Sequence, residues 1–388
     1  MLEHILFVTL NLVLLLVFVI NARGANRYKS QNVIAKYYPS IIAFTLILGA
    51  RYMRGNDYLH YQDVYNHGND YEQKLFDWLN DTMHLFYISD TGIFFVYSLI
   101  FIVGATIIWD YYSSISKWLV PIFLTCFILF DEWFIRQAVA YSFLFVFARY
   151  LFDSRQNFNK RFIYSSIFAF IAIGMHTATI IPLLAILLFY FFYSKPICYY
   201  YTIPLFLFAT FYVQYSFNFS DLSVILNYVA DNGSGHFAEY AKQDDQWFSA
   251  DAIQQNFARN PIVKIIETIG EMSFLYLGYK VLKSPAIKNL KGYVDIKSLV
   301  VFFNVHVVGI IIVHSFFLVE IPKRIGQSMS IFWCFPFAFV LYNLKYMKLT
   351  VIDRLCCCGL AYFVYDYIKY LFFRTDAAYP YLFIWDKI

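Results

Sequence analysis

Residues 5–20, with the sequence ILFVTLNLVLLLVFVI, form a run without a single charged side chain. An α-helix needs about 20 mostly apolar residues to cross the hydrocarbon core of a bilayer, so this run predicts a membrane span. Glu3 precedes it and Arg23 follows it, without a basic leader or an obvious small-residue cleavage site. We therefore expect an uncleaved first helix with its N-terminus outside, and not a secretory signal peptide.

Similar runs recur throughout the 388 residues, of which 60% are hydrophobic and 14% charged. A soluble protein carries about 25% charged residues, so the composition predicts an all-α polytopic membrane protein with a single domain over residues 1–388. We expect two long outer loops, about 51–90 and 218–261, which are typical of lids or binding loops. We expect about twelve transmembrane helices: 4–22, 36–50, 91–110, 118–132, 134–152, 161–175, 177–193, 198–217, 262–283, 298–319, 326–344 and 352–372.

The charges divide by side of the membrane. With the N-terminus outside, the inner connections contain 18 of the 30 lysines and arginines but only 4 of the 26 acidic residues. This asymmetry matches the preference of basic residues for the cytoplasmic side. It predicts a multi-pass protein of a bacterial inner membrane with periplasmic N- and C-termini. It also places both long loops on the outer face.

The sequence LGARYMRGNDYLHYQDVY, residues 48–65, follows the second predicted span on that outer face. If the helix continues, Arg51, Arg54, Tyr58 and Tyr61 share one side of it, whereas Gly55 would instead break it. Arginine matches phosphate oxygens with a two-pronged geometry. The alternative is that both arginines contact lipid headgroups or pair with nearby aspartates such as Asp57.

Three further clusters lie at predicted outer helix ends. Arg136 and Gln137 begin a helix after Glu132, where the helix dipole favours an anion, although a local ion pair would also explain Arg136. His176 interrupts an apolar stretch and is either a proton acceptor or a buried hydrogen-bonding residue. Arg324 lies in the sequence EIPKRIG, where lipid headgroups are the alternative partner. Together these residues could converge in one vestibule.

The sequence lacks several common catalytic and metal-binding motifs, which narrows the range of possible functions. No Asp-x-Asp, phosphate-binding loop, GxSxG or His-Glu-x-x-His sequence occurs, so we expect neither a metal site nor a cofactor. Charged residues inside the spans are few, namely Glu267, Glu271 and Asp366, and they form no obvious relay across the bilayer. This argues against an ion-coupled transporter.

The order of these motifs resembles the EpsG-like family of Wzy-type polysaccharide polymerases, which act in O-antigen, capsule and exopolysaccharide synthesis. The resemblance spans nearly the whole chain through short motifs. They are Gly49, Arg51, Gly55, Asp57, Tyr58 and Tyr61; then Arg136, Gln137 and Ala140; then His176, Thr177, Ala178 and Pro182; and finally Arg324.

The resemblance implies a glycosyltransferase of GT-C-like architecture that joins oligosaccharide repeats carried on polyprenyl (undecaprenyl) pyrophosphate. Its partners would be the lipid-linked donor and acceptor, the bilayer and a chain-length regulator, without nucleic acid. A transporter or flippase and an O-antigen ligase-like transferase are the alternatives. The expected site has pyrophosphate-binding Arg51, Arg54, Arg136 and Arg324, a catalytic base among His176, Asp57 and Glu132, and sugar-binding Tyr58, Tyr61 and Gln137.

Overall fold

The computed structural model describes residues 2–25, 32–55, 57–68, 73–214, 260–284, 295–318, 320–372 and 382–386. The described part is helical apart from a short two-stranded sheet. Its main elements are α1 (Leu2–Ala25), α2 (Val33–Gly49), β1 (Arg51–Tyr52), α3 (Tyr58–His67), α4 (Lys74–Leu85), α5 (Ile93–Tyr111), α6 (Ser116–Trp133), α7 (Ile135–Phe152), α8 (Phe158–Met175), α9 (Ile180–Phe192), α10 (Tyr199–Phe208), α16 (Pro261–Lys283), α18 (Ile296–Ser315), α19 (Glu320–Ser330), α20 (Cys334–Asn343), α21 (Val351–Gly359), α22 (Tyr362–Phe372) and β2 (Leu382–Phe383).

Each of the twelve predicted spans contains helix where the structure describes it, although several begin or end in turns and the span 352–372 is divided between α21 and α22. Within those ranges, five helical stretches are long and apolar enough to cross a membrane. They are Glu3–Ala25, Ile93–Tyr111, Ile296–Ser315, Pro322–Tyr346 and Val351–Phe372. The protein is therefore an α-helical, multi-pass membrane protein. The count of twelve spans and the GT-C-like architecture stay predictions.

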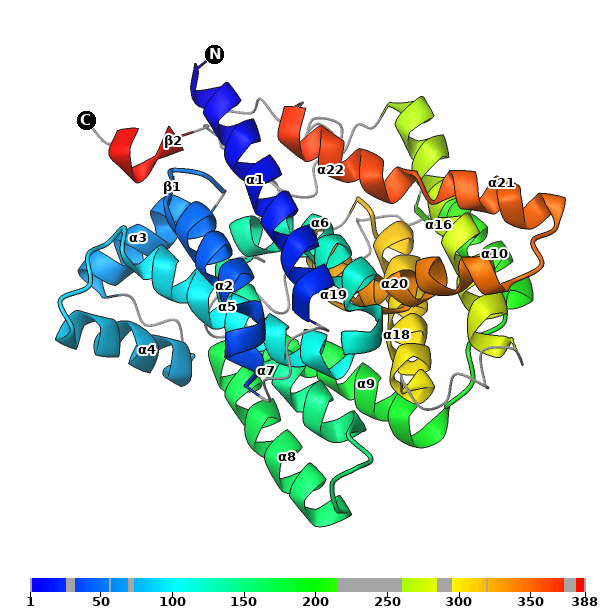
Figure 1. The fold of residues 1–388 in the computed structure, drawn as a ribbon, viewed down its shortest axis with the longest axis horizontal. Helices are drawn as coiled ribbons and strands as arrows, with labels where there is room; N and C mark the ends of the chain where they lie inside the picture. The colour runs from blue at the N-terminus through cyan, green and yellow to red at the C-terminus, as the bar shows by residue number, and fades with distance from the viewer. Residues whose placement is uncertain are drawn as a thin grey trace, which may run out of the picture.

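The helices pack around an aromatic core. Figure 1 shows α5, α6 and α7 in the middle of the bundle, with α1 and α22 across its upper side and α8 at its lower edge. Phe101, Trp109, Phe123 and Phe145 are buried and contact one another edge-to-face or stacked. α5 and α7 approach closely because Gly104 has no side chain, and a Cβ there would collide with the Ser142 backbone. α8, α9 and α10 leave many large apolar side chains exposed, among them Phe170, Leu184 and Phe208, as contact with lipid requires.

The first long loop has structure of its own, namely β1, α3 and α4, and its role as a lid or binding loop stays a prediction. α2 ends at Gly49, and β1 pairs antiparallel with β2 from the end of the chain. Met53 and Gly55 then have φ angles of 55° and 104°, a region that favours glycine, and Asp57 caps α3. The helix therefore does not continue outward through Arg51 and Arg54. The second long loop lies outside the described residues apart from its last positions, 260 and 261.

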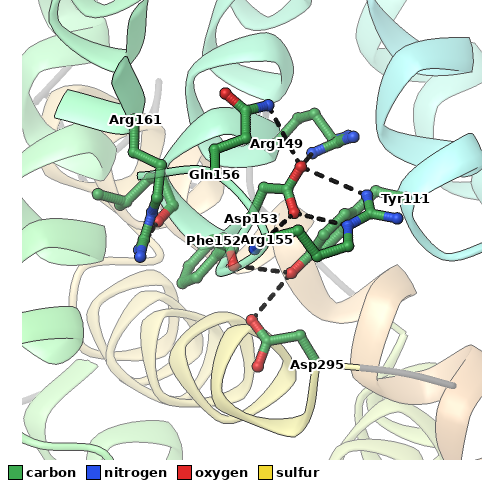
Figure 2. A network of polar contacts seen from close by, with 9 residues as sticks. Tyr111, Arg149, Phe152, Asp153, Arg155, Gln156, Arg161 and Asp295 are labelled. Atoms are coloured by element: carbon green, nitrogen blue, oxygen red, sulfur yellow. Dashed lines mark hydrogen bonds and ion pairs between the residues drawn. The ribbon is translucent and has the colours of Figure 1, made fainter. Parts of the chain in front are cut away.

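A dense polar network ties several helices together at one end of the bundle (Figure 2). Asp153, which caps the C-terminus of α7, accepts hydrogen bonds from Arg149 at 2.6 Å and Arg155 at 2.8 Å. The Tyr111 hydroxyl lies 3.0 Å from both the Phe152 carbonyl and the Asp295 carboxylate. Because Tyr111 ends α5 and Asp295 caps α18, the network fixes the ends of three helices.

We expect Asp153→Asn to destabilise the protein by about 2 kcal/mol, because the partly buried Arg149 loses its anionic partner. Burial alone would raise the pKa of Asp153, but hydrogen bonds from Arg155 and Arg149 outweigh it and hold that pKa well below its usual range. The stabilisation is therefore present above about pH 4 and is lost as pH falls toward the lowered pKa. Thermal unfolding in detergent measures both effects.

Arg155→Gln is the matched control, since its side chain is 74% exposed and a bond to water replaces the lost one. Its loss of stability should be under about 1 kcal/mol. Equal losses for the two variants would contradict a central role for Asp153.

Candidate functional site

The sequence motifs gather at the other end of the same helices. Where the network of Figure 2 holds the C-terminal ends of α5 and α7, the motifs occupy their N-terminal ends. A separate apolar cluster joins α3, α4 and α5 to the start of α7 and the end of α8. It includes Tyr58, Phe94, Ile135 and Met175. We call this the motif end of the bundle.

Asp57 stands at the first turn of α3, after the bend at Gly55. Its backbone carbonyl accepts the first helical hydrogen bond, from Tyr61 at 2.9 Å. Burial raises the pKa of its carboxyl group above the usual value, and electrostatic interactions with Arg324, His60 and Arg136 oppose that rise. The carboxylate is therefore held near two arginines from distant parts of the chain and is more basic than an ordinary aspartate.

His176 lies between α8 and the short 3-10 turn Thr177–Thr179, with an extended backbone (φ −156°). Burial lowers its pKa to about 3, assisted by the charges of Arg136 and Arg324 and opposed by a backbone hydrogen bond. The ring is therefore neutral at pH 7. Its Nδ1 accepts a hydrogen bond from the Ala178 amide at 3.2 Å. A neutral ring whose Nδ1 accepts carries its proton on Nε2, so Nε2 is a donor.

Arg136 and Arg324 come from two different helices but act on the same two groups, Asp57 and His176. Arg136 is the second residue of α7, and Arg324 lies over the Phe134 ring at 5.6 Å. α19, which carries Arg324, packs closely against α18 at Gly309. A Cβ at Gly309 would collide with the backbone of Gly326 and Ser330, so the close approach depends on glycine there. α7 and α19 therefore bring the charges of Arg136 and Arg324 to bear on Asp57 and His176, while an open vestibule at this place stays a prediction.

Arg54 has its described contacts in a second place, and Arg51 joins the two places, because its guanidinium also lies 5.6 Å from the Phe94 ring of the motif end. The side chains of Arg51 and Arg54 are 2% and 1% exposed. Arg51 donates to the Leu48 carbonyl at 2.8 Å, and the Arg54 guanidinium lies 4.1 Å from the Phe7 ring and 5.3 Å from the Tyr370 ring. Both line a small pocket between α1, α2, α22 and β2. We call this the Arg51–Arg54 pocket.

The predicted sugar-binding side chains are packed inside the motif end. Tyr58 is fully buried and stacks on Phe94, with ring centroids 3.9 Å apart, while Tyr61 is 6% exposed and lies edge-on to Phe76. Gln137 is 8% exposed and hydrogen-bonds with Tyr141 one turn further along α7. In this conformation the three residues hold α3 and α7 in place, and their contact with sugar stays a prediction. The side chain of Glu132 lies outside what the structure describes.

Two polar pairs inside the bundle were not predicted from the sequence. Glu271 lies 3.3 Å from His306, and Glu267 lies 4.0 Å from His314, between α16 and α18. Each of these two glutamates therefore has a histidine neighbour, and the expectation that charged residues within the spans form no relay across the bilayer stays a prediction. The available signal was their i, i+4 spacing on one helix and two histidines eight residues apart on another. Among the residues that the structure describes, no three histidine, cysteine or acidic side chains form a metal site.

Comparison with known proteins agrees with the order of the motifs. No curated protein matches the chain. No solved structure matches it either. The EpsG family matches residues 36–383, which include all the motif residues named above. Since this match covers far more than half of the sequence, the chain belongs to the EpsG family, a family of membrane proteins of the Wzy-type polysaccharide polymerase kind.

Proposed function

We propose that this protein is a metal-independent glycosyltransferase that polymerises oligosaccharide repeats carried on polyprenyl pyrophosphate. It acts on the periplasmic side of a bacterial inner membrane, with both termini on that side and a GT-C-like arrangement of about twelve spans. The observation that carries the proposal is the convergence of Arg136 and Arg324 on Asp57 and His176. Two cations near a basic carboxylate suit a reaction that expels a pyrophosphate.

In the proposed reaction, a sugar hydroxyl of the acceptor attacks the anomeric carbon of the donor. The new glycosidic bond forms while the bond to the pyrophosphate breaks, and the leaving group keeps the electron pair. Arg136 and Arg324 stabilise the negative charge that develops on it, as preorganised charges do in a site shielded from water. Asp57 takes the hydroxyl proton, since its raised pKa makes it a stronger base than His176.

His176 then has a different role from that of the base. With Nδ1 occupied by the Ala178 amide, the neutral ring presents Nε2–H to the substrate. This donor suits a phosphate oxygen of the leaving group or the attacking hydroxyl. A purely structural role for His176, as a buried hydrogen-bonding residue, accounts for its contact with Ala178. It does not explain why the charges of two arginines act on the ring.

Polymerisation involves two lipid-linked substrates, and the arginines form two groups. The leaving pyrophosphate of the donor belongs with Arg136 and Arg324, beside the base. We assign the pyrophosphate of the acceptor to the Arg51–Arg54 pocket, whose walls combine two cations with apolar side chains from α1 and α22. In this conformation the pocket has room for about one water molecule, so binding of the pyrophosphate headgroup requires α1 and α22 to move apart. A chain-length regulator is a further proposed partner.

A transporter of lipid-linked oligosaccharides is the second candidate, favoured by the two His–Glu pairs between α16 and α18. The two functions differ in the glycan that cells make without this chain. We expect such cells to display surface glycan with single repeat units, as gel electrophoresis of the extracted glycan shows. Loss of every repeat from the outer face would support transport instead. Full-length chains in these cells would contradict both functions.

A further inference from the structure

Glu271 and His306 meet in the interior of the protein, between α16 and α18. His306 lies halfway along α18, one of the stretches long and apolar enough to cross the membrane. The two side chains are 6% and 1% exposed, and the Phe274 ring lies 5.2 Å from the imidazole. A charge on either group alone would be costly in such surroundings.

The hydrogen bonds of His306 define where its protons are. Its Nδ1 lies 2.8 Å from the Ser330 carbonyl oxygen, which can only accept, so Nδ1 carries a hydrogen. The other ring nitrogen, Nε2, faces Oε2 of Glu271 at 3.3 Å. Neither of these two atoms has a hydrogen-bond partner elsewhere in the described ranges. A bare Nε2 lone pair against a carboxylate oxygen would be repulsive and would leave a buried negative charge.

We propose that Glu271 and His306 form a proton-binding site within the membrane, which holds one proton between Oε2 and Nε2 at neutral pH. The proton converts the pair from a net charge of −1 to zero, whether it resides on the carboxyl group or on the imidazole. In water at pH 7 a glutamate is ionised and a histidine is mostly neutral, so the folded protein takes up this proton. The site is independent of the proposed polymerase activity.

The second pair repeats the arrangement nearer the end of α16 at Pro261. The Thr210 hydroxyl donates to the Phe206 carbonyl at 2.7 Å, so its oxygen is available to accept from His314 Nδ1 at 3.1 Å. His314 Nε2 then faces Glu267 at 4.0 Å. Since Glu267 precedes Glu271 by one helical turn, the two pairs follow one another along α16 and α18.

Other titratable groups lie on the helices that bear the pair or pack against it. On α16 these are Lys264, which contacts the Thr210 carbonyl at 3.1 Å, and Glu267; on α18 the group is His314; and on α20 it is the buried thiol of Cys334. The site also touches the helix that bears Arg324, because Ser330, the partner of His306, is the last residue of α19. Loss of the proton is therefore expected to weaken the packing of α16, α18 and α19.

Thermal unfolding of the purified full-length protein between about pH 7 and pH 9 tests the site. Folding takes up a proton, so the unfolding equilibrium constant should rise by up to about tenfold per pH unit from this site. Glu271→Gln should remove this component, since its amide donates to Nε2 at every pH. Glu3→Gln, at an exposed position of α1, should keep the wild-type dependence.

A spectroscopic measurement covers the case in which Glu271→Gln does not fold. In wild-type protein at neutral pH, infrared and nitrogen NMR spectra should show either a protonated carboxyl group at Glu271 or a doubly protonated ring at His306. An ionised carboxylate beside a neutral imidazole would overturn the proposal. So would a folded Glu271→Gln variant whose unfolding depends on pH as the wild type does.

Discussion

Asp57→Asn is expected to slow chain elongation by about 10²- to 10⁴-fold, the usual contribution of a general base. Asparagine preserves the size of the side chain but cannot accept the hydroxyl proton. In the wild-type protein the rate should rise with pH through the raised pKa of Asp57, because only the ionised carboxylate is a base. That rise should be absent from the residual activity of the variant. Elongation rates over a range of pH values measure both effects.

His176 supplies the matched comparison. If Nε2 is a donor, His176→Gln retains an N–H group and should keep most of the activity, whereas His176→Ala should lose about 10- to 100-fold. Since the pKa of His176 is about 3, its ionisation should not shape the rate near neutral pH. Full activity of Asp57→Asn, with His176→Gln as impaired as His176→Ala, would identify the histidine as the base.

Arg136→Ala is expected to lower the elongation rate by about 10²- to 10³-fold, the usual effect of removing one group that stabilises developing charge. Arg136→Lys should recover part of the rate, because an ammonium group is a point charge without the planar fork of arginine. Arg324→Ala should resemble Arg136→Ala, since both side chains act on Asp57 and His176. Rates at saturating lipid-linked substrate measure this effect.

Two controls separate this site from the rest of the protein. Arg155→Gln changes an exposed arginine at the opposite end of the bundle and should elongate at the wild-type rate. Arg51→Ala should mainly raise the substrate concentration that is needed, because the Arg51–Arg54 pocket is proposed to bind the acceptor lipid. An Arg136→Ala protein that elongates normally would show that the leaving pyrophosphate lies elsewhere.

The helices were largely predictable from the sequence. A long apolar run between charged ends lies in the bilayer, where a helix satisfies its own backbone hydrogen bonds. The path after α2 was not predictable. The sequence left open whether the chain continues as a helix after Gly49, and this is decided by pairing of Arg51 with Phe383, over 300 residues away. Such a contact leaves no local pattern. The φ angle of Gly55 is the part that a reader of the sequence could anticipate.

The site was predictable as a set of residues but not in its arrangement. Topology placed four arginines on one face, yet only Arg136 and Arg324 are near Asp57 and His176 in their described interactions. The division arises because Arg54 packs between Phe7 and Tyr370, at opposite ends of the chain. Likewise, the tyrosines at positions 58 and 61 are buried by rings from α4 and α5, which sequence spacing does not reveal.

The most direct measurement uses the purified protein in lipid vesicles with an oligosaccharide repeat attached to polyprenyl pyrophosphate, followed by mass analysis of the products. The account predicts lipid-linked products of two, three and more repeats, with one free polyprenyl pyrophosphate released for each bond formed. It also predicts that Asp57→Asn protein yields almost none of them. Folded wild-type protein that leaves the repeat at its original length, or only moves it across the bilayer, would contradict the account.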